Sequence, residues 1–203
     1  MDLRAIKTKL LPFLSKWWLS LLLVLFSWFI IEQFYIALRY NIFYAVNYSH
    51  VFGFSILYFL MDNLTLILHE AGHTIFGIFG WRFLTVLGGT LMQLIIPTLI
   101  IVFGWMNRKL FITQAALYWL GFAWLDTAAY CADAYSKSLP LLGNLPKSAH
   151  DFSNLLSALN ILDSYSTVAW ILFSIGIVAL LVGILLPLFH SSSYKEVDLD
   201  LKL

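Results

Sequence analysis

The sequence has few charged side chains and a single cysteine. Of its 203 residues, 12 are Lys or Arg and 11 are Asp or Glu, so charged residues make up 11% of the chain, against about 25% in ordinary soluble domains. With a formal net charge of +1, this excludes a disordered protein and a nucleic-acid-binding protein with a basic face. Cys131, being alone, cannot form an internal disulfide or a cysteine-based zinc site.

Apolar residues fill the place of the missing charges. Hydrophobic residues reach 61% and aromatic residues 17%, and the mean hydropathy is +0.85. This composition indicates an integral membrane protein surrounded by lipid. A helix needs about 20 mostly apolar residues to cross a bilayer. We therefore expect an all-α, polytopic membrane protein, a single membrane domain over residues 1–203 with about five transmembrane helices and six possible. The candidate spans are 17–38, 52–79, 90–105, 110–135 and 167–189.

The segments between and after these spans also allow predictions of their structure. We expect a short helix over 151–162, before the last span, and a flexible polar tail over 191–203. Segment 81–87 (WRFLTVL) is rich enough in β-branched and aromatic residues to form a strand or re-entrant edge. Such an edge could bind an extended substrate backbone, with Gln93 helping to hold it. The alternative for this segment is an interfacial linker into the span that follows the pair Gly88 and Gly89.

The distribution of Lys and Arg favours a cytoplasmic N-terminus. With that orientation, five spans place seven of the 12 basic residues inside, in the sense of the positive-inside rule. We expect the protein in a bacterial inner (plasma) membrane.

One motif carries chemistry: residues 69–73 read His-Glu-Ala-Gly-His, an H-E-x-x-H sequence. On a helix, His69 and His73 project from the same face, so both imidazoles can bind one Zn²⁺ ion. Glu70 is then placed to take a proton from a zinc-bound water. A carboxylate in mid-bilayer costs about 2.5–3.5 kcal/mol and usually serves function; the alternative is a polar cluster that packs helices. We expect the metal within the membrane, towards the cytoplasmic face.

The third zinc ligand is open among four residues. His150 is favoured, because a neutral imidazole suits zinc and the loop before it is long enough to fold back against the motif. Asp126 and Asp133 share one face of the fourth expected span, and either could bind the metal or orient a ligand histidine. Asp151 also suits the N-cap of the short helix.

The motif and its surroundings resemble the site-2 protease family of intramembrane zinc metalloproteases. The resemblance rests on HEAGH in a hydrophobic span and on GGTLMQLIIP (88–97) after it. The segments YCADAYSKSLPLLG and HDFSNLL resemble a compact bacterial membrane branch of such peptidases, so the likeness covers about residues 62–163. It implies that His69 and His73 bind zinc and that Glu70 is the general base. The aspartate of the family's Asn-Pro…Leu-Asp-Gly pattern has only partial counterparts, at Asp126 and Asp163.

The residues and the resemblance together predict a zinc-dependent intramembrane endopeptidase. Its substrates would be transmembrane or membrane-proximal peptides, its surroundings the lipid bilayer, and nucleic acid is not an expected partner. Two alternatives stay open: a membrane zinc hydrolase that acts on a lipid amide or another small amphiphile, and a non-catalytic metal-binding membrane protein.

Overall fold

The computed structural model describes residues 3–42 and 53–189, and within these residues all regular structure is helical. The all-α prediction is confirmed for this part of the chain; the tail 191–203 lies outside it. The α-helices are α1 (Leu3–Tyr40), α2 (Phe54–Gly77), α3 (Arg82–Met106), α4 (Leu110–Ala132), α5 (Asp151–Ala158) and α6 (Tyr165–Phe189). Short 3-10 turns at Leu142–Asn144, Lys147–Ala149 and Leu162–Ser164 connect α4, α5 and α6.

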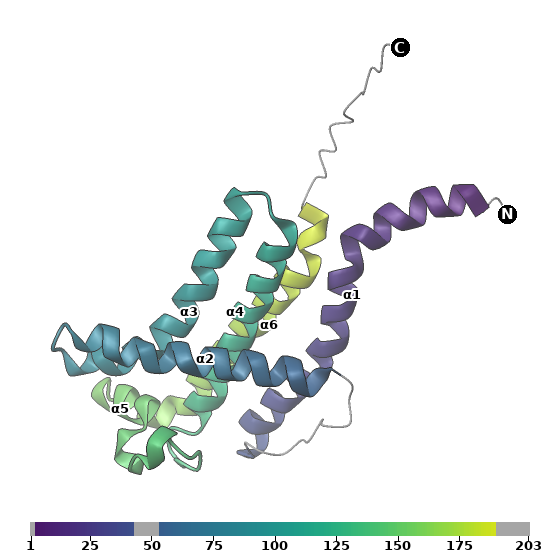
Figure 1. Cartoon of the computed structure of the whole chain (residues 1–203). Helices are drawn as coiled ribbons and strands as arrows, with labels where there is room; N and C mark the ends of the chain where they lie inside the picture. The colour runs from purple at the N-terminus through teal and green to yellow at the C-terminus, as the bar shows by residue number, and fades with distance from the viewer. Residues whose placement is uncertain (1–2, 43–52, 190–203) are drawn as a thin grey trace.

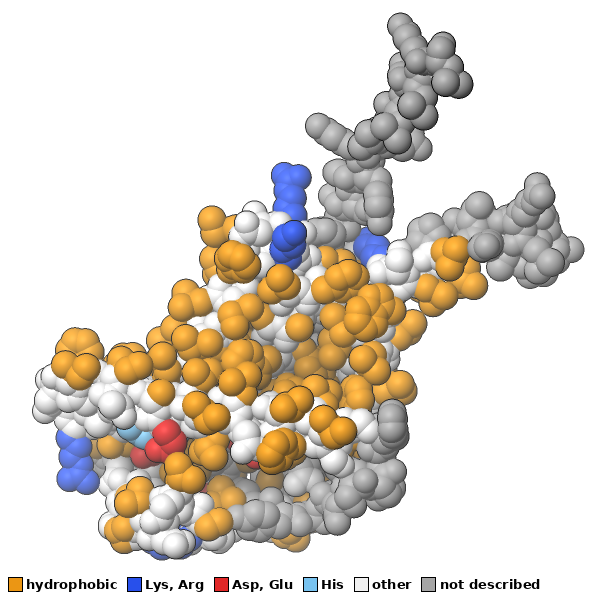
Figure 2. Space-filling view, viewed as in Figure 1, with side chains coloured by type: hydrophobic (Ala, Val, Ile, Leu, Met, Phe, Trp, Pro, Cys, Tyr) orange, Lys and Arg blue, Asp and Glu red, His pale blue; other side chains and the backbone are white. Residues whose placement is uncertain are grey.

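Three segments are long and apolar enough to cross a membrane: Phe13–Tyr40 in α1, Arg82–Met106, which is α3, and Leu162–Phe189, which includes α6. Large apolar side chains stand exposed along all of them, and Figure 2 shows this apolar surface covering much of the visible face. A soluble monomer does not expose so much contiguous apolar surface. The structure thus supports a helical membrane protein, but it does not confirm five spans.

Helix α4 occupies the centre of the molecule and contacts α1, α3 and α6. Its residues Phe122, Leu125 and Ala128 are fully buried. Helices α4 and α6 approach closely at Gly121, where an added Cβ atom would lie 2.7 Å from the side chain of Leu180. Small residues at such contacts are typical of helix packing in membranes.

Helix α2 does not run beside the other long helices but across them, at the end of the molecule away from the α3–α4 turn (Figure 1). Two of the five expected spans, 52–79 (α2) and 110–135 (α4), are missing from the three candidate spans found among the described residues. The polar residues of α2, among them Asp62, His69 and Glu70, lower its hydropathy. His69 is buried against the bundle, whereas Ile67 and Ile78 are exposed on the outside.

The third helix begins earlier than expected. Segment 81–87 is neither a strand nor a re-entrant edge, because α3 begins at Arg82 and continues without a break through Gly88 and Gly89. The expectation that the span begins only after this glycine pair, at residue 90, is wrong. The glycines instead allow α2 and α3 to touch: an added Cβ at Gly88 would lie 2.8 Å from the Gly72 carbonyl oxygen. This contact brings α3 against the histidines of α2.

Candidate metal centre

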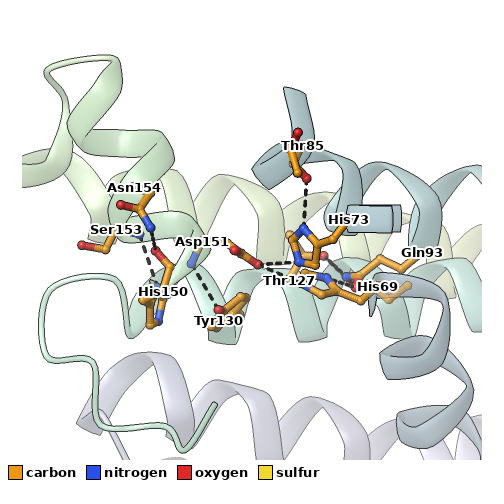
Figure 3. A network of polar contacts seen from close by, with 11 residues as sticks. His69, His73, Thr85, Gln93, Thr127, Tyr130, His150, Asp151, Ser153 and Asn154 are labelled. Atoms are coloured by element: carbon orange, nitrogen blue, oxygen red, sulfur yellow. Dashed lines mark hydrogen bonds and ion pairs between the residues drawn. The ribbon is translucent and has the colours of Figure 1, made fainter. Parts of the chain in front are cut away.

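Helices α2 and α5 bring two histidines and one aspartate to a common point. His69 Nε2 lies 2.9 Å and His73 Nε2 lies 3.2 Å from Asp151 Oδ2. The three ligand atoms all lie within 4.8 Å of one another (Figure 3). The histidines share a face because they are four residues apart on α2, and Asp151 is the first residue of α5.

The hydrogen bonds behind the two imidazoles fix their tautomers. His73 Nδ1 lies 2.9 Å from the backbone carbonyl oxygen of Thr85, which only accepts, so His73 Nδ1 carries the proton. His69 Nδ1 lies 2.9 Å from Gln93 Oε1, and the amide nitrogen of Gln93 donates to Thr127 Oγ1 at 2.6 Å. Gln93 Oε1 is therefore an acceptor, and His69 Nδ1 also carries its proton. When either ring is neutral, its Nε2 presents a lone pair towards Asp151.

A positive charge suits this arrangement. Burial raises the pKa of the Asp151 carboxyl, but its hydrogen bonds with His69 and His73 outweigh burial and hold that pKa below its usual range. The hydrogen bond with Asp151 in turn raises the pKa of His73 to about 9, so without a metal a proton on His73 Nε2 faces the Asp151 anion, and a metal ion would take the place of that proton. Ligand atoms around a tetrahedral zinc ion lie about 3.4 Å apart, close to the two distances here. The group can hold a metal ion.

A second layer of contacts holds the two histidines in place. Gln93 is buried and connects His69 of α2 to Thr127 of α4, whose hydroxyl donates to the Ala123 carbonyl at 2.7 Å. The sequence suggested that Gln93 could help to hold a substrate backbone; in the structure its side chain is hydrogen-bonded to His69. Such partners orient a ligand ring and set its tautomer.

Gly89 is a site residue that the sequence reasoning missed. A Cβ atom at this position would lie 2.7 Å from His69 Nε2 and 2.8 Å from His73 Cε1. Only glycine leaves room for both rings against α3. The signal was the glycine pair itself, which the expected span 90–105 left outside the helix and which instead allows a close approach of two helices.

Glu70 lies beside the three-residue group without belonging to it. It is half-buried, and its carboxylate is close enough to act electrostatically on His73 of α2 and on Tyr130 of α4. A partly exposed carboxylate can be reached by water. Its position therefore suits a general base.

The structure does not bring His150 to the other two histidines. His150 is the N-cap residue of α5, and its Nε2 atom lies 3.3 Å from Asp133 Oδ2. His150 was expected to be the third ligand, but its neighbour Asp151 is the residue that lies close to His69 and His73. The two residues follow each other in the chain, but their side chains leave the start of α5 in different directions (Figure 3).

The other two candidate ligands also lie outside the group. Asp133 follows the last residue of α4 and accepts hydrogen bonds from Ser138 N at 2.6 Å and Leu139 N at 2.9 Å. Asp126 is half-buried on α4, near enough to Asp62 and His69 to interact with them electrostatically.

The group lies close to one end of the helical bundle. Thr127, which connects to His69 through Gln93, is five residues before the end of α4 at Ala132, or about 8 Å at 1.5 Å per residue. Its depth cannot be measured along α2, as in a spanning helix, because α2 lies across the bundle (Figure 1).

Comparisons of the chain with protein-family models, with curated proteins and with solved structures found no match. The resemblance to site-2 proteases therefore depends only on the sequence segments quoted above.

Proposed function

We propose that this protein is a zinc-dependent intramembrane endopeptidase. The observation that carries the proposal is the convergence of the side-chain atoms of His69, His73 and Asp151 at an H-E-x-x-H motif that also contains Glu70. The proposed ligands are His69, His73 and Asp151, so Asp151 replaces His150 in the set expected from the sequence. Three protein ligands leave the fourth position of a zinc ion open, as in catalytic zinc sites.

The chemistry divides between the metal and the protein. Zinc at this position would polarise a peptide carbonyl and lower the pKa of a coordinated water towards about 7. Glu70 accepts the proton of the attacking water and returns it to the leaving amine. Gln93 and the Thr85 carbonyl hold the two rings in the tautomer that leaves Nε2 unprotonated.

The position of the group favours peptide bonds close to a membrane surface. Thr127, to which His69 connects through Gln93, lies about 8 Å along α4 from the end of that helix, and Asp151 of the group begins the short helix α5. A transmembrane substrate needs to unwind only near its end to reach this depth. We therefore favour membrane-proximal peptide bonds over bonds at the centre of the bilayer.

The arrangement of the helices supports a proposal on how the protein is oriented in the membrane. The N-terminal part of α1, the α3–α4 turn and the end of α6 lie at one end of the molecule, and α2 and α5 at the other (Figure 1). We propose that α1, α3, α4 and α6 cross a bacterial inner membrane. The first end then carries Arg4, Lys7, Lys9, Lys16, Arg108 and Lys109, and the second carries Arg39, Arg82, Lys137 and Lys147.

The positive-inside rule assigns the more basic end to the cytoplasm. The N-terminus is then cytoplasmic, as expected from the sequence. The metal group, however, lies towards the opposite face, because α2 does not cross the membrane in this arrangement. The proposed substrates are peptides at the non-cytoplasmic surface.

The test is zinc content together with cleavage. The purified full-length protein should hold about one zinc ion per chain by elemental mass spectrometry. In vesicles, it should cut single-span peptides, with fragments identified by mass spectrometry. Glu70→Gln should keep its zinc and lose cleavage by at least about 100-fold, whereas the exposed control Asp163→Asn should keep both. Cleavage retained in Glu70→Gln would contradict the mechanism.

A second candidate is a zinc hydrolase for lipid amides. The proposed shallow position of the group, near the depth of lipid headgroups, favours it. Its product would be a released acyl chain rather than a peptide fragment, so the same vesicles distinguish the two activities. Zinc bound without either product would indicate a non-catalytic metal-binding protein.

A further inference from the structure

His150 is fully buried beside the proposed ligand Asp151, yet its ring faces away from the metal group. Its Nδ1 atom accepts a hydrogen bond from Ser153 N at 3.3 Å (Figure 3), so the proton of the neutral ring is on Nε2. That atom lies 3.3 Å from Asp133 Oδ2. The ring therefore connects the start of α5 to the segment after α4.

Asp133 is a fixed anion at the end of α4. Burial raises the pKa of its carboxyl, but the nearby His150 ring, the Ser136 hydroxyl and the backbone N–H groups of Leu139 and Ser138 outweigh burial and hold that pKa below its usual range. Two of these donors are backbone N–H groups of residues 138 and 139. Asp133 thus has a defined position from which to hold His150.

Tyr130 of α4 holds the same segment from another side. The centre of its ring lies 4.3 Å from that of His150, and its hydroxyl oxygen accepts the backbone N–H of Asp151 at 3.2 Å. The peptide group between His150 and Asp151 is therefore held by α4 through both a ring contact and a hydrogen bond. The direction of the Asp151 side chain follows from that of its backbone.

We propose that Asp133 and His150 are positioning residues of the metal centre. The Asp133 carboxylate holds the His150 ring, and the ring fixes the backbone from which Asp151 reaches the histidines of α2. This inference depends on the metal centre proposed above. It assigns His150, expected from the sequence to be a ligand, to the support of one.

Simple capping of α5 does not explain the choice of residue. The N-cap position favours Ser, Asp, Asn and Thr, whose short side chains accept the N–H bond. Histidine at 150 accepts that bond through Nδ1 and also places Nε2 close to Asp133. A short capping side chain cannot do both.

Two substitutions at position 150 separate these contacts. His150→Asn places an amide oxygen where Nδ1 stands and so keeps the cap, but it is too short to reach Asp133. His150→Gln places an amide N–H group where Nε2 stands and so keeps the donor to Asp133, but it weakens the cap. Asp133→Asn removes the carboxylate that faces His150 Nε2. Asp163→Asn is the matched control at an exposed aspartate.

The experiment is a Co²⁺ titration of the full-length protein in detergent, followed by visible absorption and confirmed by competition with Zn²⁺. His150→Asn and Asp133→Asn should weaken Co²⁺ binding about 10–100-fold and change the shape of the Co²⁺ absorption bands. His150→Gln should bind Co²⁺ more tightly than His150→Asn, and Asp163→Asn should bind like the wild type. Circular dichroism of the metal-free proteins checks that the helices are intact.

Three results would overturn the inference. If His150→Asn binds Co²⁺ like the wild type and His150→Gln binds weakly, His150 only caps α5. Unchanged affinity and spectra in both His150→Asn and Asp133→Asn would show that the pair positions nothing. If the wild-type protein binds neither Co²⁺ nor Zn²⁺, the proposed metal centre is wrong, and Asp133 and His150 cannot be its positioning residues. This result is distinct from the other two.

Discussion

The proposed ligand atoms depend on a glycine for their positions. Gly89 stands where a Cβ atom would lie 2.7 Å from His69 Nε2 and 2.8 Å from His73 Cε1, closer than Cβ atoms approach other heavy atoms. Because Gly89 lies within α3, its backbone cannot move away without shifting the helix. At the scale of single residues, an added methyl group at position 89 therefore forces the two histidine rings to shift.

We expect Gly89→Ala to weaken zinc binding at least about 10-fold, because both rings must shift away from the new methyl group. The matched control is Gly77→Ala on α2, where the added Cβ lies 3.6 Å from Thr85 Cγ2, an ordinary contact. Gly77→Ala should keep zinc affinity and gain up to about 1 kcal/mol of helix stability. Zinc titration and thermal unfolding in detergent measure the two effects. Equal zinc affinity in both variants would contradict this account of Gly89.

Gln93 is expected to act on zinc only through His69. Gln93→Leu removes the acceptor of the His69 Nδ1 proton and leaves a buried donor unpaired, so zinc affinity should fall about 10–100-fold. Gln93→Glu keeps an acceptor at the same place and should retain more affinity than Gln93→Leu. Competition with a zinc-binding dye measures both. If Gln93→Leu instead lowers only substrate affinity, Gln93 contacts the substrate, as the sequence alone had indicated.

At the scale of elements, Asp133 at the end of α4 makes the stability of the folded protein depend on pH. Hydrogen bonds hold the pKa of Asp133 below its usual range in the folded protein despite burial. The stabilisation from Asp133 is therefore complete at pH values above the unfolded pKa of about 3.9 and is lost as pH falls through the lower folded pKa.

Asp133→Asn should accordingly lower the free energy of unfolding by about 2 kcal/mol at pH 7. The difference from the wild type should shrink below about pH 4. Unfolding at several pH values, monitored by circular dichroism in detergent, measures it, with Asp163→Asn as the control. A difference that stays constant down to pH 2 would mean that the charge of Asp133 does not stabilise the fold.

Helices were predictable from this sequence because long apolar runs give few alternatives in a membrane protein. Helix α6 spans Tyr165–Phe189 where 167–189 was expected, and α4 spans Leu110–Ala132 where 110–135 was expected. The start of α3 was not predictable from local signals. Glycines at 88 and 89 favour a break in an isolated chain, and only the contact with Gly72 of α2 makes them favourable within a helix.

The metal group was predictable in part, because two of its three residues are close in sequence and the third is not. The spacing of His69 and His73 already places both on one face of a helix, so the structure only had to supply a third group. The choice between adjacent residues His150 and Asp151 depends on the direction in which α5 leaves its loop. That direction is set by contacts of Tyr130 and Asp133 with the segment, which are distant in sequence from the motif.

At the scale of the whole molecule, the crosswise α2 decides on which side of the membrane the centre lies. Five spans with α2 among them would place the motif towards the cytoplasm. With α1, α3, α4 and α6 as the spanning helices, the motif lies at the end opposite the N-terminus (Figure 1). The same sequence and the same positive-inside rule thus give opposite locations for the centre, and labelling of the two ends separates them.

Two exposed positions report on the two ends: Asn107 in the α3–α4 turn and Ser148 in the turn before α5. Each is changed to cysteine in the full-length protein, in which the native Cys131 is buried and should not react. In spheroplasts of expressing bacteria, a membrane-impermeant maleimide should label Ser148→Cys at once and Asn107→Cys only after the membrane is opened. The reverse pattern would place the metal group at the cytoplasmic face. Labelling of both positions in intact spheroplasts would contradict the proposed set of spanning helices, because α3 and α4 would then not separate their ends across the bilayer.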